Sequence, residues 1–179
     1  EAEAAEILRA LPAELAGLTM ALPLEALEER LADGRTSAIV TTFPAVAAVR
    51  ARLGETGGRI RVIPVETEFT EAAVRALSSL PATARLALVT VDRARWDEEA
   101  NDVMKIVGRQ RWLKMIVLDG GDRGLASRLE HVDAVLFVPR TREAVEPLER
   151  PGQVLVELSR QLTPRARERL AQAASTLAD

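Results

Sequence analysis

The sequence predicts an α/β fold built from two similar units in tandem, Rossmann-like or periplasmic-binding-protein-like, each with a parallel sheet between two layers of helices. Short apolar segments alternate with helix-like segments along the chain, which is the order typical of parallel sheets. Three of these segments are continuously apolar, as strands buried on both faces are: Ala38–Val40, Leu86–Val89 and Val135–Val138. A third observation, an internal repeat, indicates the two units.

The repeat is visible in segments that recur at nearly constant spacing. Met20 and Met115 lie 95 residues apart in similar strand-like segments, and Phe69-Thr70 and Leu162-Thr163 each open a helix-like segment 93 residues apart. We place the boundary at Pro81, so that residues 1–80 form a first lobe and residues 81–179 a second. Two such lobes predict a cleft between them, and a cleft is where a small ligand binds.

The first copy is predicted to contain four helices and three strands. Leucines spaced three and four residues apart indicate the helix at 24–31. Pro44 suits the first turn of a helix, Pro64 restricts its strand to a sheet edge or to an end there, and Thr70 is a suitable N-cap. In chain order the elements are helix 1–10, strand 18–22, helix 24–31, strand 38–40, helix 44–53, strand 60–65 and helix 70–80.

The second copy begins with a strongly apolar strand at 86–91. Val103, Ile106 and Val107 form the apolar side of the next helix, and Thr163 with Pro164 caps and starts the last one. The elements are strand 86–91, helix 97–107, strand 115–118, helix 125–129, strand 134–138, helix 141–148, strand 154–158 and helix 163–177.

The copies differ at their beginnings. By the repeat spacing, the counterpart of strand 86–91 would precede Glu1. We therefore expect the first lobe to lack its opening strand, whether cut off, unresolved or replaced by another segment, and the chain to be a fragment of a longer protein.

Composition excludes several kinds of chemistry. The chain has no cysteine and one histidine, His131, so thiolate metal sites, His-cluster metal sites, cysteine nucleophiles and disulfides are excluded. A net charge of −3 gives no electrostatic case for nucleic-acid binding by these residues. No apolar run approaches the roughly 20 residues of a membrane span. We expect no cofactor and no enzymatic activity, because no acid–base set is specified.

Candidate ligand contacts follow from the rule that ligands bind beyond the carboxyl ends of parallel strands. Thr41 and Thr42 are the most suggestive, because two hydroxyls and free helix N–H groups would converge on an anionic group. Capping of the following helix by Thr42 is an equally open interpretation, and Asp119 lies in a sequence that is also typical of a tight turn. The candidates are Thr41, Thr42, Phe43, Glu66, Thr67, Asp92, Arg93, Asp119, Gly120, Arg140, Thr141, Glu157 and Ser159.

Several short motifs resemble one group of bacterial GntR-type transcription regulators. These are Val40–Phe43, Ile63–Glu66, Arg85–Thr90, Asp133–Val138 and Val154–Glu157. In that group an N-terminal winged-helix domain binds DNA and a C-terminal α/β domain senses an effector. The resemblance covers about residues 18–170. It implies that this chain is the sensor half of a cytoplasmic homodimer, with a small-molecule effector in the cleft and operator DNA bound only by a winged-helix domain upstream of these residues.

Three other functions fit the same pattern. A two-lobed solute-binding protein shares the architecture and differs in location. A small α/β enzyme would act in the cleft, and a structural module would bind no ligand at all. Binding of organic acids, amino acids or sugar phosphates separates the last from the sensors.

Overall fold

A computed structural model describes residues 7–8, 19–32, 34–54, 60–91, 93, 95–108, 112–118 and 124–178. It has the predicted α/β fold with parallel sheets. Contacts divide the chain into unit 1, residues 1–68 and 160–179, and unit 2, residues 69–159. These units do not coincide with a single division at Pro81. Residues 69–80 belong to unit 2, and residues 160–179 belong to unit 1.

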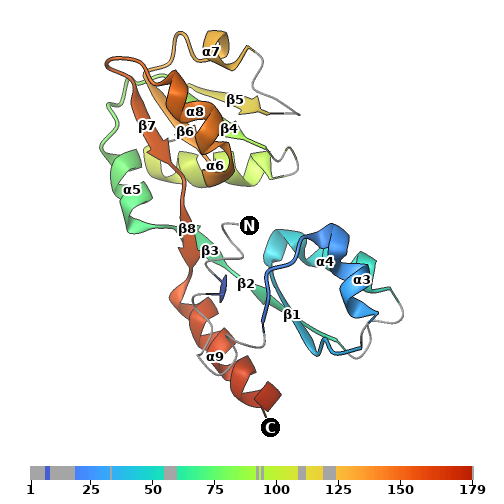
Figure 1. The fold of residues 1–179 in the computed structure, drawn as a ribbon. Helices are drawn as coiled ribbons and strands as arrows, with labels where there is room; N and C mark the ends of the chain where they lie inside the picture. Colours follow the sequence, from blue (N-terminus) through green and yellow to red (C-terminus); the bar gives the residue numbers. More distant parts are fainter. Residues whose placement is uncertain are drawn as a thin grey trace. The chain divides into compact units, whose positions relative to one another are not determined.

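Unit 2 contains a four-stranded parallel sheet in the order β5-β4-β6-β7 (Figure 1). β4 pairs with β5 on one side and with β6 on the other, so the strand order reverses between β4 and β6. Its strands are β4 (Leu86–Thr90), β5 (Leu113–Val117), β6 (Ala134–Phe137) and β7 (Val154–Glu157).

Helices cover both faces of this sheet, because alternate side chains of each central strand point to opposite sides. Leu86 and Leu88 pack in one cluster with Leu77 and Val103. Val89 points to the opposite face and packs in a second cluster with residues of α7 and α8, whose bounds are given below. Unit 2 is therefore a three-layer α/β/α arrangement. The first layer holds α5 (Glu71–Ser78) and α6 (Trp96–Val107), and the other holds α7 (Leu125–Arg128) and α8 (Arg142–Val145).

Unit 1 has a two-stranded parallel sheet, with Ala38 opposite Arg61 and Thr42 opposite Val65. One face packs against α9, and the other packs against α3 and α4 through Leu27, Val49 and Leu53. The elements are η1 (Leu24–Ala26), α3 (Leu27–Leu31), β1 (Ala38–Thr42), η2 (Phe43–Ala45), α4 (Val46–Leu53), β2 (Arg61–Val65) and α9 (Pro164–Ala178).

Two short strands, β3 (Thr67–Phe69) and β8 (Arg160–Leu162), pair where the chain passes between units. Thr70 N donates to Ser159 O at 3.0 Å, and Thr163 N donates to Glu66 O at 3.1 Å. Residue 70 thus lies opposite residue 159, and residue 66 lies opposite residue 163, so the two strands run antiparallel. The two bonds are also equivalent, because Thr163 and Ser159 each lie 93 residues after their counterparts.

This pair of strands leads to an exchange of helices between the sequence copies. After β3, α5 belongs to unit 2, and its Leu77 packs in one cluster with Val156 of β7. After β8, α9 belongs to unit 1, and its Leu170 packs in one cluster with Ile63 of β2. Leu170 and Val156 each follow their counterparts by 93 residues, so the two clusters are built from equivalent positions.

The predicted strand at 18–22 is wrong over its described part, since residues 19–22 form no regular structure. In the second copy, the equivalent strand β5 lies at the edge of the described sheet and pairs with β4. Within the described residues, β1 has no partner in the position that β4 takes beside β6, so residues 19–22 lack the neighbour with which they would pair. The predicted helix at 141–148 is also divided, into η4 (Pro139–Thr141), α8 and η5 (Glu146–Leu148).

Candidate functional site

A groove of about 300 Å³ lies in unit 2, between α5 and the edge strand β7. Its apolar lining comes from three alanines of the helix together with Leu155 and Val156 of the strand, and polar side chains stand at the carboxyl end of β7. Its polar end agrees with the rule that ligands of parallel sheets bind beyond the carboxyl ends of the strands, although the groove lies at the sheet edge and not at the switch point between β4 and β6. The lining residues are Thr70, Ala72, Ala73, Ala76, Arg142, Leu155, Val156, Glu157 and Ser159.

Glu157 is the centre of the polar end of the groove. Its carboxylate forms an ion pair with Arg142 and accepts a hydrogen bond from Ser159 Oγ at 2.8 Å. Arg142 begins α8, and its Nε also lies 3.6 Å from Glu146 Oε1. The side chains of Arg142 and Glu157 are 52% and 22% exposed. A ligand entering the groove would therefore meet both charges without a large prior rearrangement.

Thr70 connects the start of α5 to the same end of the groove. Its extended backbone places it at the N-cap, and its Oγ1 accepts a hydrogen bond from Ala73 N at 3.3 Å. Its own backbone N–H donates to Ser159 O. The cap predicted from the sequence is confirmed, and it fixes the helix beside Ser159.

Comparison with unit 1 explains why the groove is open. Ala76 of α5 corresponds to Arg169 of α9 at the 93-residue spacing, and Ala72 corresponds to Arg165. In unit 1, Arg169 Nη1 lies 3.5 Å from Pro64 O, so its long side chain reaches β2. An alanine at the equivalent place in unit 2 leaves that space unfilled.

Of the predicted contact residues in unit 2 that the structure describes, Glu157 and Ser159 line the groove. Arg93 and Arg140 are exposed and follow β4 and β6, but neither lines it. Asp92 and Asp119 lie outside the described residues. The predicted residues of unit 2 are thus brought together only in part.

The other predicted residues belong to unit 1, where they share one edge of the sheet. Thr42 pairs with Val65, so Phe43 and Glu66 follow at adjacent positions beyond the carboxyl ends. Thr42 occupies the N-cap position of η2, yet its side chain makes no capping hydrogen bond, so the structure does not support the capping interpretation. Phe43 is 48% exposed, and Thr41 is half-buried.

Sequence reasoning missed Arg142 and the alanines of α5. Arg142 lies inside a helix, where the strand-end rule does not select it, and alanines carry no chemical signal. The signal that could have found them was the repeat, since Ala72 and Ala76 stand where the second copy has arginines.

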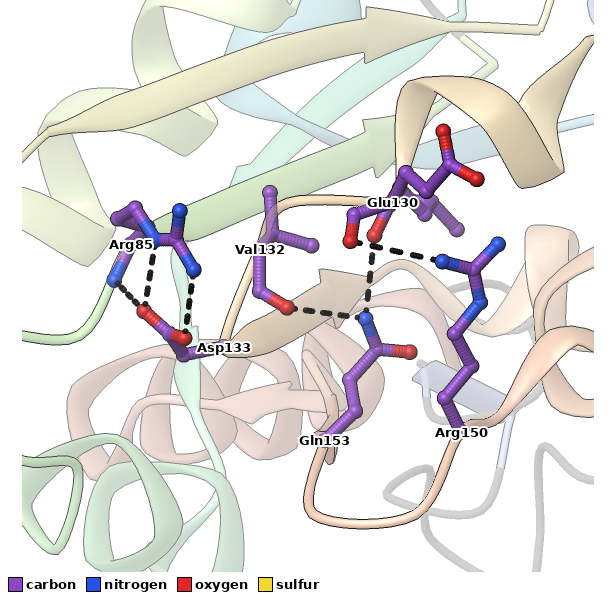
Figure 2. A network of polar contacts seen from close by, with 7 residues as sticks. Arg85, Glu130, Val132, Asp133, Arg150 and Gln153 are labelled. Carbon is purple, nitrogen blue, oxygen red and sulfur yellow. Dashed lines mark hydrogen bonds and ion pairs between the residues drawn. The ribbon is translucent and has the colours of Figure 1, made fainter.

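A second polar network lies at the opposite, amino-terminal edge of the sheet (Figure 2). Asp133 accepts hydrogen bonds from Arg85 N at 2.7 Å and from Arg85 Nε and Nη2, each at 3.1 Å. The side-chain hydrogen bond from Arg85, followed by the backbone one, lowers the pKa of Asp133. Gln153 Nε2 donates to Leu129 O and Val132 O nearby. This network joins the starts of β4 and β6 and faces away from the groove end.

The residues that the structure describes hold neither a cluster of metal ligands nor a membrane-spanning helix. Among them, no group of three or more His, Cys, Asp or Glu side chains could hold a metal ion, and His131 is exposed in a loop. In the same part of the chain, no helix is both long enough and apolar enough to cross a membrane. No protein-family model and no curated protein matches the chain.

Proposed function

We propose that the chain is the ligand-sensing domain of a DNA-binding transcriptional regulator of the GntR type, with a small-molecule effector bound in the groove of unit 2. The observation that carries the proposal is the convergence of Arg142, Glu157 and Ser159 at the carboxyl end of β7, over an apolar floor. Its volume of about 300 Å³ lies at the lower end of the range of small-molecule sites.

The family assignment within this proposal is supported by the motifs of the sequence. Val40–Phe43 spans the end of β1 and Ile63–Glu66 the end of β2, so two of the quoted motifs meet at one edge of the unit 1 sheet. From the resemblance we further propose a cytoplasmic homodimer that contacts operator DNA through a winged-helix domain outside these residues.

The position of the groove suggests how binding could be communicated. Ser159 is the last residue of unit 2 before β8, and Thr70 directly follows β3. A ligand that touches both residues acts on the two segments through which the chain passes between the units. If it binds one conformation of these segments more tightly, it shifts the population toward that conformation.

The test is ligand screening by thermal shift, followed by calorimetry, against organic acids, amino acids and sugar phosphates. A ligand present at 100 times its Kd stabilises the native state by about 2.7 kcal/mol. Ala76→Arg copies Arg169 of the other repeat and should remove the binding by filling the groove. Ser78→Arg, on an exposed position of α5, is the matched control and should leave binding unchanged.

Two results would overturn the proposal. One is a complete panel without a thermal shift, and the other is a ligand that binds Ala76→Arg as tightly as it binds the unmodified chain. The regulatory part is tested separately, by adding the ligand to the full-length protein on its own promoter DNA and measuring the change in DNA affinity.

A further inference from the structure

We infer that the groove selects small zwitterions, molecules that carry a carboxylate and an ammonium group on a short aliphatic body. This inference rests on the proposed function and specifies its ligand. It follows from four properties of the lining residues: spare hydrogen-bond donors, spare acceptors, balanced charge and a floor of small side chains.

The donors for a carboxylate come from Arg142 and Thr70. Arg142 uses Nη2 toward Glu157 and approaches Glu146 with Nε, and a guanidinium carries five N–H groups, so further donors remain. Thr70 uses its oxygen as an acceptor for Ala73 N, which leaves its O–H as a donor. A planar carboxylate suits the guanidinium because it can accept two parallel hydrogen bonds.

The acceptors for an ammonium group come from Glu157 and Ser159. An ionised carboxylate has about four lone-pair sites, and Glu157 accepts one hydrogen bond from Arg142 and one from Ser159. Because Ser159 donates its hydroxyl hydrogen to Glu157, its oxygen is free to accept from a ligand donor. An ammonium with three donors can therefore be shared between these two neighbours.

The charge balance favours a ligand that has no net charge. Arg142 and Glu157 are the charged residues of the lining, and their formal charges cancel. Glu146 adds a negative charge behind Arg142. A phosphate or dicarboxylate would meet these carboxylates without a second cation, whereas a zwitterion extends the existing ion pair with opposite charges on both sides.

The floor of the groove is apolar, which favours an aliphatic body over a polar one. Ala72, Ala73 and Ala76 form its helical side, and Leu155 and Val156 form its strand side. A short aliphatic side chain buries against these apolar surfaces. Small aliphatic and hydroxylated α-amino acids fit this description.

The experiment compares matched probes by calorimetry on the intact chain. The zwitterions are glycine, L-alanine, L-serine and L-valine, and the single-charge controls are propionate, ethylamine and inorganic phosphate. We expect at least one zwitterion to bind, and propionate and ethylamine to bind at least tenfold more weakly. Arg142→Gln and Glu157→Gln should each weaken zwitterion binding at least tenfold. Arg142→Lys should bind more tightly than Arg142→Gln but more weakly than the unmodified chain, because lysine keeps the charge without the planar pair of N–H donors.

The inference fails if none of the zwitterions binds, or if propionate or phosphate binds as tightly as they do. The proposed function fails separately, if the broader panel of organic acids and sugar phosphates also gives no shift that depends on Ala76. Circular dichroism of every variant, with Glu149→Gln as an exposed control, confirms that a lost signal reflects the groove and not the fold.

Discussion

Thr70 and Thr163 begin α5 and α9 with the same hydrogen bond. Ala73 N donates to Thr70 Oγ1 at 3.3 Å, and Ala166 N donates to Thr163 Oγ1 at 3.2 Å. Each threonine directly follows one strand of the antiparallel pair. The two helices thus start in the same way, although they complete different units.

The caps should contribute measurably to stability. Thr163→Ala removes the oxygen that accepts from Ala166 N and is expected to lower the free energy of unfolding by about 1 kcal/mol. Thr163→Ser keeps the acceptor and should lose much less. Urea denaturation of the three proteins measures the difference, and equal losses in both variants would show that the capping bond is not the cause.

Truncation of the exchanged leucines should affect the two units separately. Leu77 and Leu170 are both buried, and replacing either by alanine should cost about 2–5 kcal/mol of the stability of its unit. Both tryptophans, Trp96 and Trp112, lie in unit 2. We expect Leu77→Ala to shift the tryptophan fluorescence transition, and Leu170→Ala to shift mainly the circular dichroism transition. Identical shifts in both signals for both variants would contradict the assignment of the helices.

The Arg85–Asp133 contact predicts a pH-dependent contribution to stability. Because Arg85 lowers the pKa of Asp133 in the folded state, this stabilisation is present above the unfolded-state value of about 3.9. It is lost as the pH falls through the folded-state pKa. Asp133→Asn should therefore lower the Tm at pH 7 and differ progressively less from the unmodified chain below about pH 4.

Glu149→Gln provides the control for this experiment, since Glu149 is exposed and takes no part in the Arg85–Asp133 contact. It should change the Tm little at either pH. A Tm difference for Asp133→Asn that stays constant down to pH 2 would rule out the electrostatic explanation.

The turn before β7 requires glycine at residue 152. Gln153 N donates to Arg150 O at 3.0 Å, Pro151 is the second residue of the turn, and Gly152 has a φ of 81°. This is the pattern of a type II turn, whose third residue needs a positive φ. Gly152→Ala should destabilise unit 2 by about 1–2 kcal/mol, the cost of a left-handed conformation for a residue with a Cβ. Gly152→Asn should cost less, and denaturation curves that rank alanine above asparagine would contradict this explanation.

The sequence predicted the longer elements well because their signals are local. Apolar runs such as Leu86–Thr90 and caps such as Thr163 depend on neighbours a few residues away. The pair β3 and β8 was missed because each strand has three residues and its partner lies about 93 residues away. Trp112 is 54% exposed although it is a large apolar residue, because the burial of a side chain depends on tertiary neighbours that periodicity does not report.

The candidate site was predictable to a similar extent. The strand-end rule selected Glu157 and Ser159, because the end of β7 is visible as the end of an apolar run. It could not select Arg142, which reaches the groove from another element. The groove is open because Ala76 has a short side chain. Its importance is recognised only when the two sequence copies are aligned, because the second copy has Arg169 at the equivalent position.

The exchange of α5 and α9 also has a consequence for biosynthesis. Unit 2 is one continuous stretch, residues 69–159, so it can fold as soon as that stretch leaves the ribosome. β1 and β2 emerge much earlier but must wait for α9 to cover Ile63 and Val65. β1 and β2 are thus synthesised before unit 2 but covered after it, and a premature stop near residue 160 would leave one face of their sheet uncovered while unit 2 folds.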